Sequence, residues 1–267
     1  MALRHPGRLT ALMILLGAAM VSPVAAADIT AREITERLFH ADPAKPVDLS
    51  RLNLSELDMS GLDFKGAKLT GSDLFGADLT GADLSRTDLS SARLDRVIII
   101  GVRFDGANLA GASLLRPSGY STLQAPPNEA ASFIGTDLRG AKIFGRFNRA
   151  NLRGADLTGA TLAPFGRTGF IEHIWRSELQ GADLSDTKMS GADLTYTLLA
   201  FSNMRGADLR GAVLKNADLS HADLTGADLT GADFTDADLD GAILTGTRGF
   251  ETALGVASAR NVDKVVR

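Results

Sequence analysis

The 267-residue sequence contains no cysteine, which excludes disulfide bonds, thiolate catalysis and cysteine-ligated metal sites. Histidine is also scarce. Beyond Ala27 only His40, His173 and His221 occur, far apart and without a metal-ligand spacing such as His-x-x-x-His. Motifs of the Gly-x-Ser-x-Gly, phosphate-loop and dinucleotide-binding types are missing. These absences predict a protein that is not an enzyme and that binds neither a cofactor nor a metal ion.

The sequence has one long apolar run, and it lies at the start of the chain. Residues 9–20 are mostly apolar, Arg4 and Arg8 flank their start, and the small residues 25–27 follow. This order is typical of a secretory signal peptide cleaved after Ala27. The run is too short for a convincing membrane span, although an uncleaved anchor is the alternative. The sequence therefore predicts a soluble, exported protein, periplasmic or secreted, whose net charge changes from −4 to −6 when residues 1–27 are removed.

Most of the remaining chain repeats a five-residue unit, Ala-Asp-Leu-x-x. Its central residue recurs at every fifth position over residues 49–114, 133–162 and 179–244, with one residue dropped before Phe147. All thirty-five centres are Leu, Phe, Met or Ile, and twenty-one of the positions two residues earlier are Ala. The pattern predicts a hydrophobic core made of the centres and these alanines.

A period of five does not suit a helix, because each centre would advance by about 140° and no apolar face would form. Within one unit, however, Ala, Asp and Leu alternate inward, outward and inward, as in an extended strand. The next two positions are usually Thr or Ser and then Gly, which bend the chain. Short extended sides joined by bends predict a coil whose backbone groups bond to the coils above and below.

The segments GADLTGADLS (76–85) and GADLTGADF (226–234) resemble the pentapeptide-repeat family, and the resemblance covers about residues 47–248. It implies an all-β fold, a right-handed quadrilateral β-helix with four pentads in each coil. Thirty-five pentads would then make nearly nine coils and a rod about 40 Å long.

Both ends of such a rod need caps, because an open strand edge invites pairing with another chain. Residues 28–46 are expected to form a helical cap, since Thr30 and Glu33 match a capping box and Ile34 and Leu38 share one helical face. Residues 249–267 leave the repeat pattern and offer apolar side chains for a C-terminal cap: Phe250, Leu254, Val262 and Val265. A dimer interface is the alternative for either segment, so the protein is expected to be a monomer or a homodimer.

Two interruptions, near residues 115–132 and 163–178, break the repeat. Each either protrudes as a loop or forms a distorted coil, with Leu123 as a degenerate centre and Ile174 in phase with the following run. Irregular segments on a rigid scaffold often carry binding residues. The candidates are Arg116, Tyr120, His173, Trp175 and Arg176. The alternative for Trp175 is that it only fills a defect in the coil.

Charge is uneven along the repeat: the formal net charge is −4 over residues 47–90, +5 over 91–176 and −8 over 177–246. The basic middle is concentrated in five further candidate binding residues: Arg139, Lys142, Arg146, Arg149 and Arg153. We expect these side chains to form a belt around several faces, which would attract an acidic partner or lipid headgroups. The alternative is a solvated surface that offsets neighbouring Asp residues.

Asp occupies seventeen of the thirty-five positions before a centre, so like charges stack from coil to coil. Lys68, one coil from both Asp48 and Asp88, interrupts one such row. The rows are interpreted as outward residues that keep the rod soluble and discourage aggregation, and a metal site is not expected. Rows of this kind can also mimic the phosphates of DNA.

The sequence thus predicts a non-catalytic exported solenoid that acts as a structural or protein-interaction scaffold in the cell envelope. Its partner would be a protein or an anionic envelope component, and no nucleic acid is expected for an exported chain. The alternative implied by the resemblance is a DNA-mimicking, topoisomerase-protecting protein of the quinolone-resistance type. The signal peptide and the basic middle both argue against mimicry.

Overall fold

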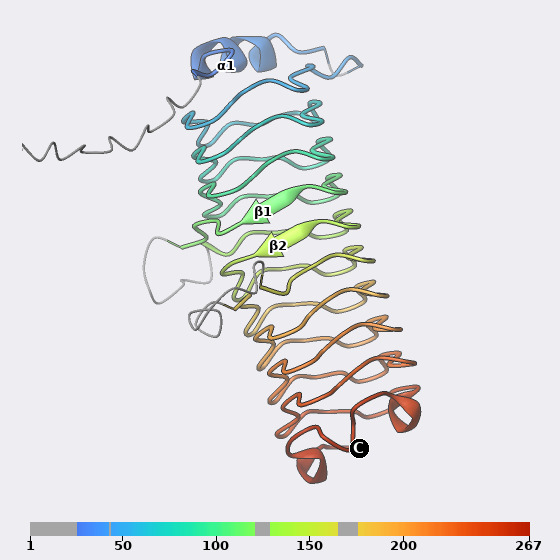
Figure 1. Cartoon of the computed structure of the whole chain (residues 1–267). Helices are drawn as coiled ribbons and strands as arrows, with labels where there is room; N and C mark the ends of the chain where they lie inside the picture. The colour runs from blue at the N-terminus through green and yellow to red at the C-terminus, as the bar shows by residue number, and fades with distance from the viewer. Residues whose placement is uncertain (1–25, 43, 121–128, 165–175) are drawn as a thin grey trace, which may run out of the picture.

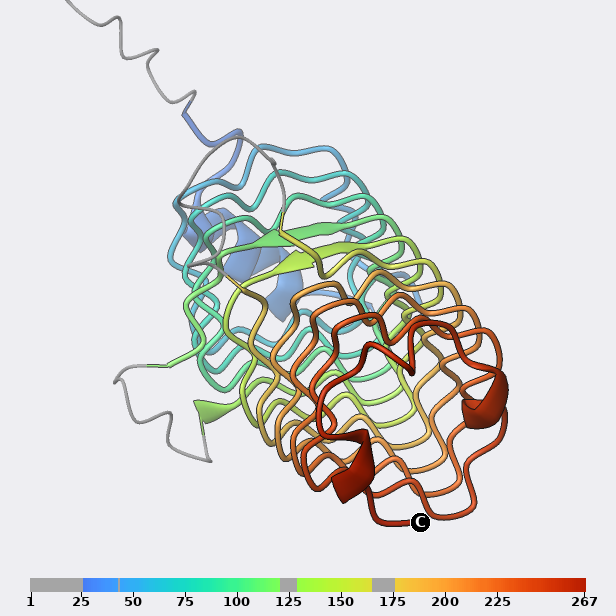
Figure 2. The ribbon, with the colours of Figure 1, turned by 60° about the horizontal axis from the view of Figure 1, so that its bottom comes forward.

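The computed structural model describes residues 26–42, 44–120, 129–164 and 176–267. The chain winds into a rod of stacked coils, with helix α1 at one end and the C-terminus at the other (Figure 1). Viewed closer to the rod axis, the coils follow one another around a common interior (Figure 2). The named elements, in order, are α1 (Ala31–Phe39), β1 (Ser113–Leu115), β2 (Lys142–Phe144), and the 3-10 turns η2 (Phe250–Thr252) and η3 (Val262–Lys264). No helix in the described part of the chain is both long enough and apolar enough to cross a bilayer.

Parallel bridges connect each coil to the next. Asp48 pairs with Lys68 and Lys68 pairs with Asp88, so successive rungs are separated by four pentads of sequence. The backbone bonds run both ways, since Leu49 N donates to Lys68 O and Lys68 N donates to Val47 O, both at 2.8 Å. Strands β1 and β2 pair in parallel with Ser113 opposite Lys142, and most other rungs are single-residue bridges. The coiled architecture expected from the period of five is therefore present.

The interior of the rod is one continuous apolar cluster, and all thirty-five repeat centres are buried in it. The alanines two residues before the centres are buried as well, which confirms the inward assignment of both positions. Several of these small-residue positions hold a hydroxyl instead of a methyl group. Ser72 and Thr87 donate to the carbonyl three residues earlier, at 2.7 and 2.6 Å, so these two buried hydroxyls are satisfied.

The Asp residues before the centres do more than face solvent. In one unit after another the Oδ1 atom accepts a hydrogen bond from the backbone N–H two residues later, as from Ser85 to Asp83 at 2.9 Å and from Thr195 to Asp193 at 3.0 Å. A carboxylate in this position closes an Asx turn at the corner of the coil. The interpretation of these residues as solubilising alone was incomplete, because they also hold the corners.

The corners also pair large residues with glycines. Arg86, Arg149, Asp186 and His221 each have a positive φ, and each side chain leans over a glycine one coil later. An alanine Cβ in place of Gly241, for example, would lie 2.6 Å from His221 Nδ1. The same relation holds for Arg51, Glu56 and Ser91 with the glycines one coil after them. At these corners the bend accommodates a large side chain because the next coil has none there, whereas Phe201 at another corner stacks on His221 of the next coil.

Helix α1 lies over the first coil (Figure 1). The predicted capping box is present: Glu33 N donates to Thr30 Oγ1 at 3.2 Å, and Thr30 N donates to Glu33 Oε2 at 2.8 Å. Ile34 and Leu38 are buried in the core cluster, as their shared helical face predicted. Lys65 fixes the end of the helix by donating to Leu38 O at 2.9 Å.

The C-terminal segment leaves the five-residue period in sequence, but the coil continues into it. The bridges form four ladders, one along each side of the coil, and all four ladders continue into this segment. The number of residues between the two members of a pair grows by one from each of these last pairs to the next: Asp228–Arg248, Asp233–Leu254, Asp238–Arg260 and Ile243–Val266. One further and wider coil therefore follows the repeats, and the Asp48 ladder has ten rungs, not the nearly nine expected: Asp48, Lys68, Asp88, Asn108, Asp137, Asp156, Lys188, Asp208, Asp228 and Arg248.

The apolar residues of this segment also differ from expectation. Phe250 is buried against Phe234, with ring centroids 5.8 Å apart, and Val262 and Val265 pack on the core. Leu254, however, is 59% exposed, because it occupies an outward rung position. It does not contribute to the predicted apolar cap.

Both interruptions lie between rungs that still pair. The sequence separation of paired residues exceeds four pentads at Arg103–Ser132, across the first interruption, and again at Arg146–Glu178, across the second. The first interruption follows the rung at Ser118, and the second precedes the rung at Glu178, so both border the same face of the rod. The predicted roles of Leu123 and Ile174 lie outside the described residues.

Candidate binding groove on the rod surface

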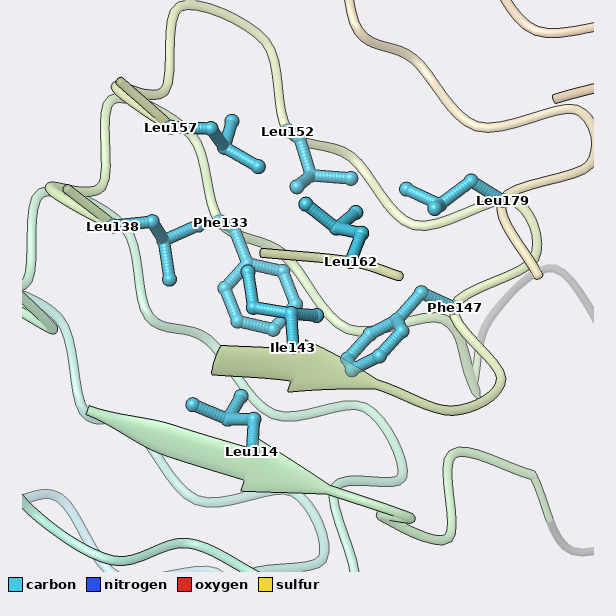
Figure 3. A pocket seen from close by; sticks show the side chains of 9 residues that line it. All are labelled: Leu114, Phe133, Leu138, Ile143, Phe147, Leu152, Leu157, Leu162 and Leu179. Atoms are coloured by element: carbon cyan, nitrogen blue, oxygen red, sulfur yellow. The ribbon is translucent and has the colours of Figure 1, made fainter. Parts of the chain in front are cut away.

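Among the residues that the structure describes, the interior offers no room for a ligand where the coil is irregular. A cavity of about 10 Å³ lies there, close to the volume of a single water-sized probe. Figure 3 shows its lining, which is entirely apolar: Leu114, Phe133, Leu138, Ile143, Phe147, Leu152, Leu157, Leu162 and Leu179. A functional surface must therefore be sought on the outside of the rod.

On one face of the rod the outward rung positions do not form a regular row of acidic residues. We call it the Glu178 face, after the rung between the two interruptions. Its outward positions, in coil order, are Asp58, Asp78, Ile98, Ser118, Arg146, Glu178, Leu198, Asp218, Asp238 and Arg260. Asp residues stand toward both ends of this face, before Arg260 at the last rung, whereas its middle positions have no Asp and include two apolar residues, one arginine and one glutamate.

A groove of about 340 Å³ opens in this middle part, and we call it the basic groove. Its size falls in the range of sites for small ligands. Its lining residues are Arg116, Pro117, Ser118, Gly119, Tyr120, Phe144, Gly145, Arg146, Arg176 and Glu178. Three guanidinium groups and one carboxylate thus surround an aromatic and aliphatic floor.

The polar residues of the groove hold one another in place. Arg146 Nε lies 3.6 Å from Glu178 Oε2, and Asn148 Nδ2 donates to the same oxygen at 2.8 Å. Asn148 Oδ1 accepts from Gln180 N at 2.9 Å, which fixes the amide. The Arg146 guanidinium lies 6.0 Å from the centre of the Tyr120 ring, within cation–π range. Arg146 is therefore held in place by Glu178 and Tyr120, and both of these partners remain at the surface.

Tyr120 forms part of the groove wall and is half-buried. Its hydroxyl donates to the carbonyl of Asn148. Burial raises the pKa of Tyr120 to about 12, and the nearby Arg146 and Arg149 offset only part of that rise. Tyr120 is therefore a neutral hydrogen-bonding wall of the groove at physiological pH, and not a proton-transfer group.

A second hollow of about 230 Å³ adjoins the basic groove, and the two share Arg116 and Phe144. Phe75 forms its floor, with the Arg93 and Arg96 guanidiniums 4.3 and 5.6 Å from the ring centre. Asp95 accepts from Arg93 at 3.2 Å and from Leu115 N at 3.1 Å. The sequence analysis missed this hollow, although a coil of four pentads puts Phe75, Asp95 and Leu115 in one row.

The structure brings together four of the ten predicted site residues, namely Arg116, Tyr120, Arg146 and Arg176, in the basic groove. Arg149 lies close enough to lower the pKa of Tyr120 against the stronger effect of burial.

The other members of the predicted belt point elsewhere. Arg139 pairs with Asp137 at 2.5 Å, and Arg153 lies 3.9 Å from Asp186. Lys142 occupies an outward rung on the Ser113 ladder, a different face. The basic residues are thus spread over several faces, as expected, but they do not form one site. The candidates His173 and Trp175 lie outside the described residues.

Two arginines that border the hollows differ from most basic residues of the rod. Neither Arg96 nor Arg176 makes an ion pair with any residue that the structure describes, whereas Arg93, Arg205 and Arg248 each pair with Asp. Guanidinium groups without a carboxylate partner are suited to bind carboxylate or phosphate in a bidentate manner. Within the described ranges, no group of three acidic or histidine side chains is placed to bind a metal ion.

A stack of four-pentad coils with a surface groove and a filled interior defines a repeat solenoid that can interact through its outside. The model of pentapeptide repeats matches the chain in 8 copies, over residues 47–71, 72–111, 129–162, 177–216 and 207–246. The matches cover more than half of the sequence, and the chain belongs to the pentapeptide-repeat family, whose fold is a right-handed β-helix. Proteins of this family are generally structural or interaction proteins.

Several solved structures are similar to this chain. HetL from the cyanobacterium Nostoc sp. strain PCC 7120, a pentapeptide repeat protein involved in heterocyst differentiation regulation, is 27% identical, with a TM-score of 0.46 and coverage of 90% of this chain and 100% of HetL. QnrB1, a plasmid-mediated fluoroquinolone resistance protein, is 18% identical, with a TM-score of 0.38 and coverage of 75% and 80%. Rfr23 from the cyanobacterium Cyanothece 51142 is 22% identical, with a TM-score of 0.22 and coverage of 66% and 90%. No curated protein sequence matches the chain.

Proposed function

We propose that the chain is a non-catalytic interaction scaffold and that its basic groove binds an anionic group of a partner. The observation that carries the proposal is the concentration of Arg116, Arg146 and Arg176 in one concavity. The same lining holds one carboxylate, that of Glu178, which lies 3.6 Å from Arg146, so its formal charges sum to a positive value. An anion is therefore attracted to the middle of the Glu178 face and repelled by the acids toward its ends.

The proposal includes export to the periplasm or the outside of the cell, which rests on the apolar and small-residue pattern of residues 1–27. It also includes a quadrilateral cross-section, since the stretch between one rung and the next holds four pentads. Helix α1 and the wide last coil are proposed to cap the two ends. Helix α1 supports this role through its buried Ile34 and Leu38, and the last coil through its buried Phe250.

Binding of the mature chain, residues 28–267, to poly-L-glutamate and to phosphatidylglycerol vesicles at low and moderate salt tests the proposal. Arg146→Glu combined with Arg149→Glu is expected to abolish binding to the preferred probe, and added salt is expected to weaken it, because exposed charges are screened over about 10 Å at 0.1 M. Arg86→Glu is the matched control, since Arg86 is also an exposed corner residue but does not border the Glu178 face. Binding that ignores salt and charge reversal, or no binding to either probe, would contradict the proposal.

The second candidate is a DNA-mimicking, topoisomerase-protecting protein. The stacked Asp218 and Asp238 and the net charge of −8 over residues 177–246 favour it. The pairing of Asp223 with Arg205 and of Asp228 with Arg248 reduces the field that such a mimic needs. Fractionation of a tagged full-length protein separates the candidates, because mimicry requires cytoplasmic retention and the scaffold proposal requires recovery from the periplasm or the medium.

A further inference from the structure

Beside the basic groove the Glu178 face carries a partly exposed apolar strip, which none of the repeat rules requires. Residues 195–201 read TYTLLAF, and their outward side chains include Tyr196, Leu198 and Phe201. Phe201 is 67% exposed and stacks on His221, with ring centroids 5.0 Å apart and planes at 18°. We call Tyr196, Leu198 and Phe201 the apolar ledge. It runs from one corner of the face to the other, because Tyr196 and Phe201 both have the positive φ of corner residues.

The ledge and the groove adjoin directly. Leu198 pairs with Glu178 as the next rung of the ladder, and Leu198 N donates to Ser177 O at 2.8 Å. The Arg176 guanidinium lies 5.8 Å from the centre of the Tyr196 ring, which joins the two surfaces at their edge. Neighbouring rungs are about 4.8 Å apart, so a ligand group in the groove and one on the ledge need only a short spacer.

Acidic residues on both sides of the groove and the ledge limit the kinds of partner that can bind there. Asp218 and then Asp238 follow Leu198 along the face, and Asp78 and Asp58 precede Ile98 on the other side of the groove. A flat anionic surface, such as a bilayer, would cover these acids as well as the arginines, because Asp78 and Asp218 lie only two rungs, about 10 Å, from the coils of Arg116 and Arg176. A short segment with one carboxylate avoids the acids and still reaches the arginines.

We infer that the basic groove and the apolar ledge together bind an acidic protein segment, in which an Asp or Glu carboxylate enters the groove and an adjacent Leu, Phe or Tyr lies on the ledge. The inference rests on the proposed function and adds the chemical class of the partner. Bidentate arginine–carboxylate bonds supply orientation, and the half-exposed aromatic and aliphatic residues of the ledge supply buried apolar area.

Selection of a random dodecapeptide library displayed on phage against the mature chain tests the inference. The selected peptides are expected to carry Asp or Glu next to an aliphatic or aromatic residue. Fluorescence anisotropy with a selected peptide should show that Arg176→Glu and Phe201→Ser each weaken binding by about tenfold or more, which is about 1.4 kcal/mol. Phe201→Ser tests the ledge without disturbing the core, because this ring is mostly exposed.

Matched controls come from other parts of the rod. Ile243→Asp changes an outward rung residue on another face, and Arg86→Glu changes a corner arginine away from the groove; both should bind the peptide like the parent chain. If Arg176→Glu abolishes binding while Phe201→Ser and Leu198→Asp leave it unchanged, anion binding by the groove stands and the inference about the ledge is wrong. Basic selected peptides, no enrichment over the Arg176→Glu chain, or tighter binding to phosphatidylglycerol vesicles would each overturn it. A dimer in sedimentation analysis that Phe201→Ser dissociates would also overturn it, because a second copy would then occupy the ledge.

Discussion

Asp223→Ala provides the sharpest test of how the corners of the coil are held. Asp223 Oδ1 accepts from Thr225 N at 2.9 Å and from the Thr225 hydroxyl, and Asp223 Oδ2 accepts from Arg205 at 2.8 Å. Alanine removes all three interactions. A net hydrogen bond is worth about 0.5–1.5 kcal/mol, and an ion pair with an exposed arginine adds about 0–1 kcal/mol. With two such hydrogen bonds and one ion pair, we expect Asp223→Ala to lower the free energy of unfolding by about 1–4 kcal/mol.

Two neighbouring variants calibrate this value in urea denaturation followed by circular dichroism. Asp223→Asn keeps an oxygen that can accept from Thr225 N and loses only the charge, so its loss should be about half as large. Leu224→Ala empties a fully buried centre and should cost about 2–5 kcal/mol. If Asp223→Ala and Asp223→Asn both unfold at the parent urea concentration, the carboxylate serves solubility alone and the corner-closing role is wrong.

Three other perturbations have defined outcomes. Hydrogen bonds from the residue two positions later lower the pKa of corner acids such as Asp228. These acids therefore stabilise the folded state fully above the unfolded pKa of about 3.9, and this stabilisation is lost as the pH falls below it. Urea midpoints that stay constant from neutral pH down to below that value would contradict this. Gly226→Ala should lower the melting temperature only through the strain of a positive φ, about 1–2 kcal/mol. Gly255→Ala should lower it further, because its Cβ would also collide with the backbone of Thr235. Equal melting temperatures of the two variants would show that the last coil does not pack on the coil before it. Deletion of residues 249–267 uncovers Phe234 and should cause association in light scattering, while a well-behaved monomer would remove the capping role.

The sequence was most informative where the five-residue period is strict. Inward and outward positions followed from alternation, and the capping box of α1 followed from Thr30 and Glu33, because each depends only on residues close in the chain. The last coil was missed because its sides lengthen by one residue each, which destroys the period while the ladders continue. Leu254 was consequently counted among the apolar residues of the cap although it points outward.

The site was harder to predict, because it depends on the register between coils. Phe75 and Leu115 are separated by a whole number of regular coils, so the period alone puts them in one row. Phe144 lies one coil after Leu115, but the first interruption stands between them. Its position beside Phe75 and Leu115 therefore follows only when the length of the interruption is known. The sequence could place Arg116, Tyr120, Arg146 and Arg176 near one another only as a group of basic and aromatic residues. It could not separate Arg146, which faces the groove, from Arg139, which pairs with its own Asp137.

The lean of the corner side chains gives the rod a direction that its repeats conceal. At several corners a side chain of one coil lies over a glycine of the coil that follows, as His221 does over Gly241 and Asp186 over Gly206, whereas Phe201 is followed one coil later by His221. Coils that look interchangeable by their pentads are therefore not interchangeable parts. A coil moved to a new place, or a rod assembled from shuffled coils, would meet side chains at corners that need a glycine. Recombination between such repeats is safest when it exchanges a coil together with its successor, and a designer who extends the rod should copy pairs of coils.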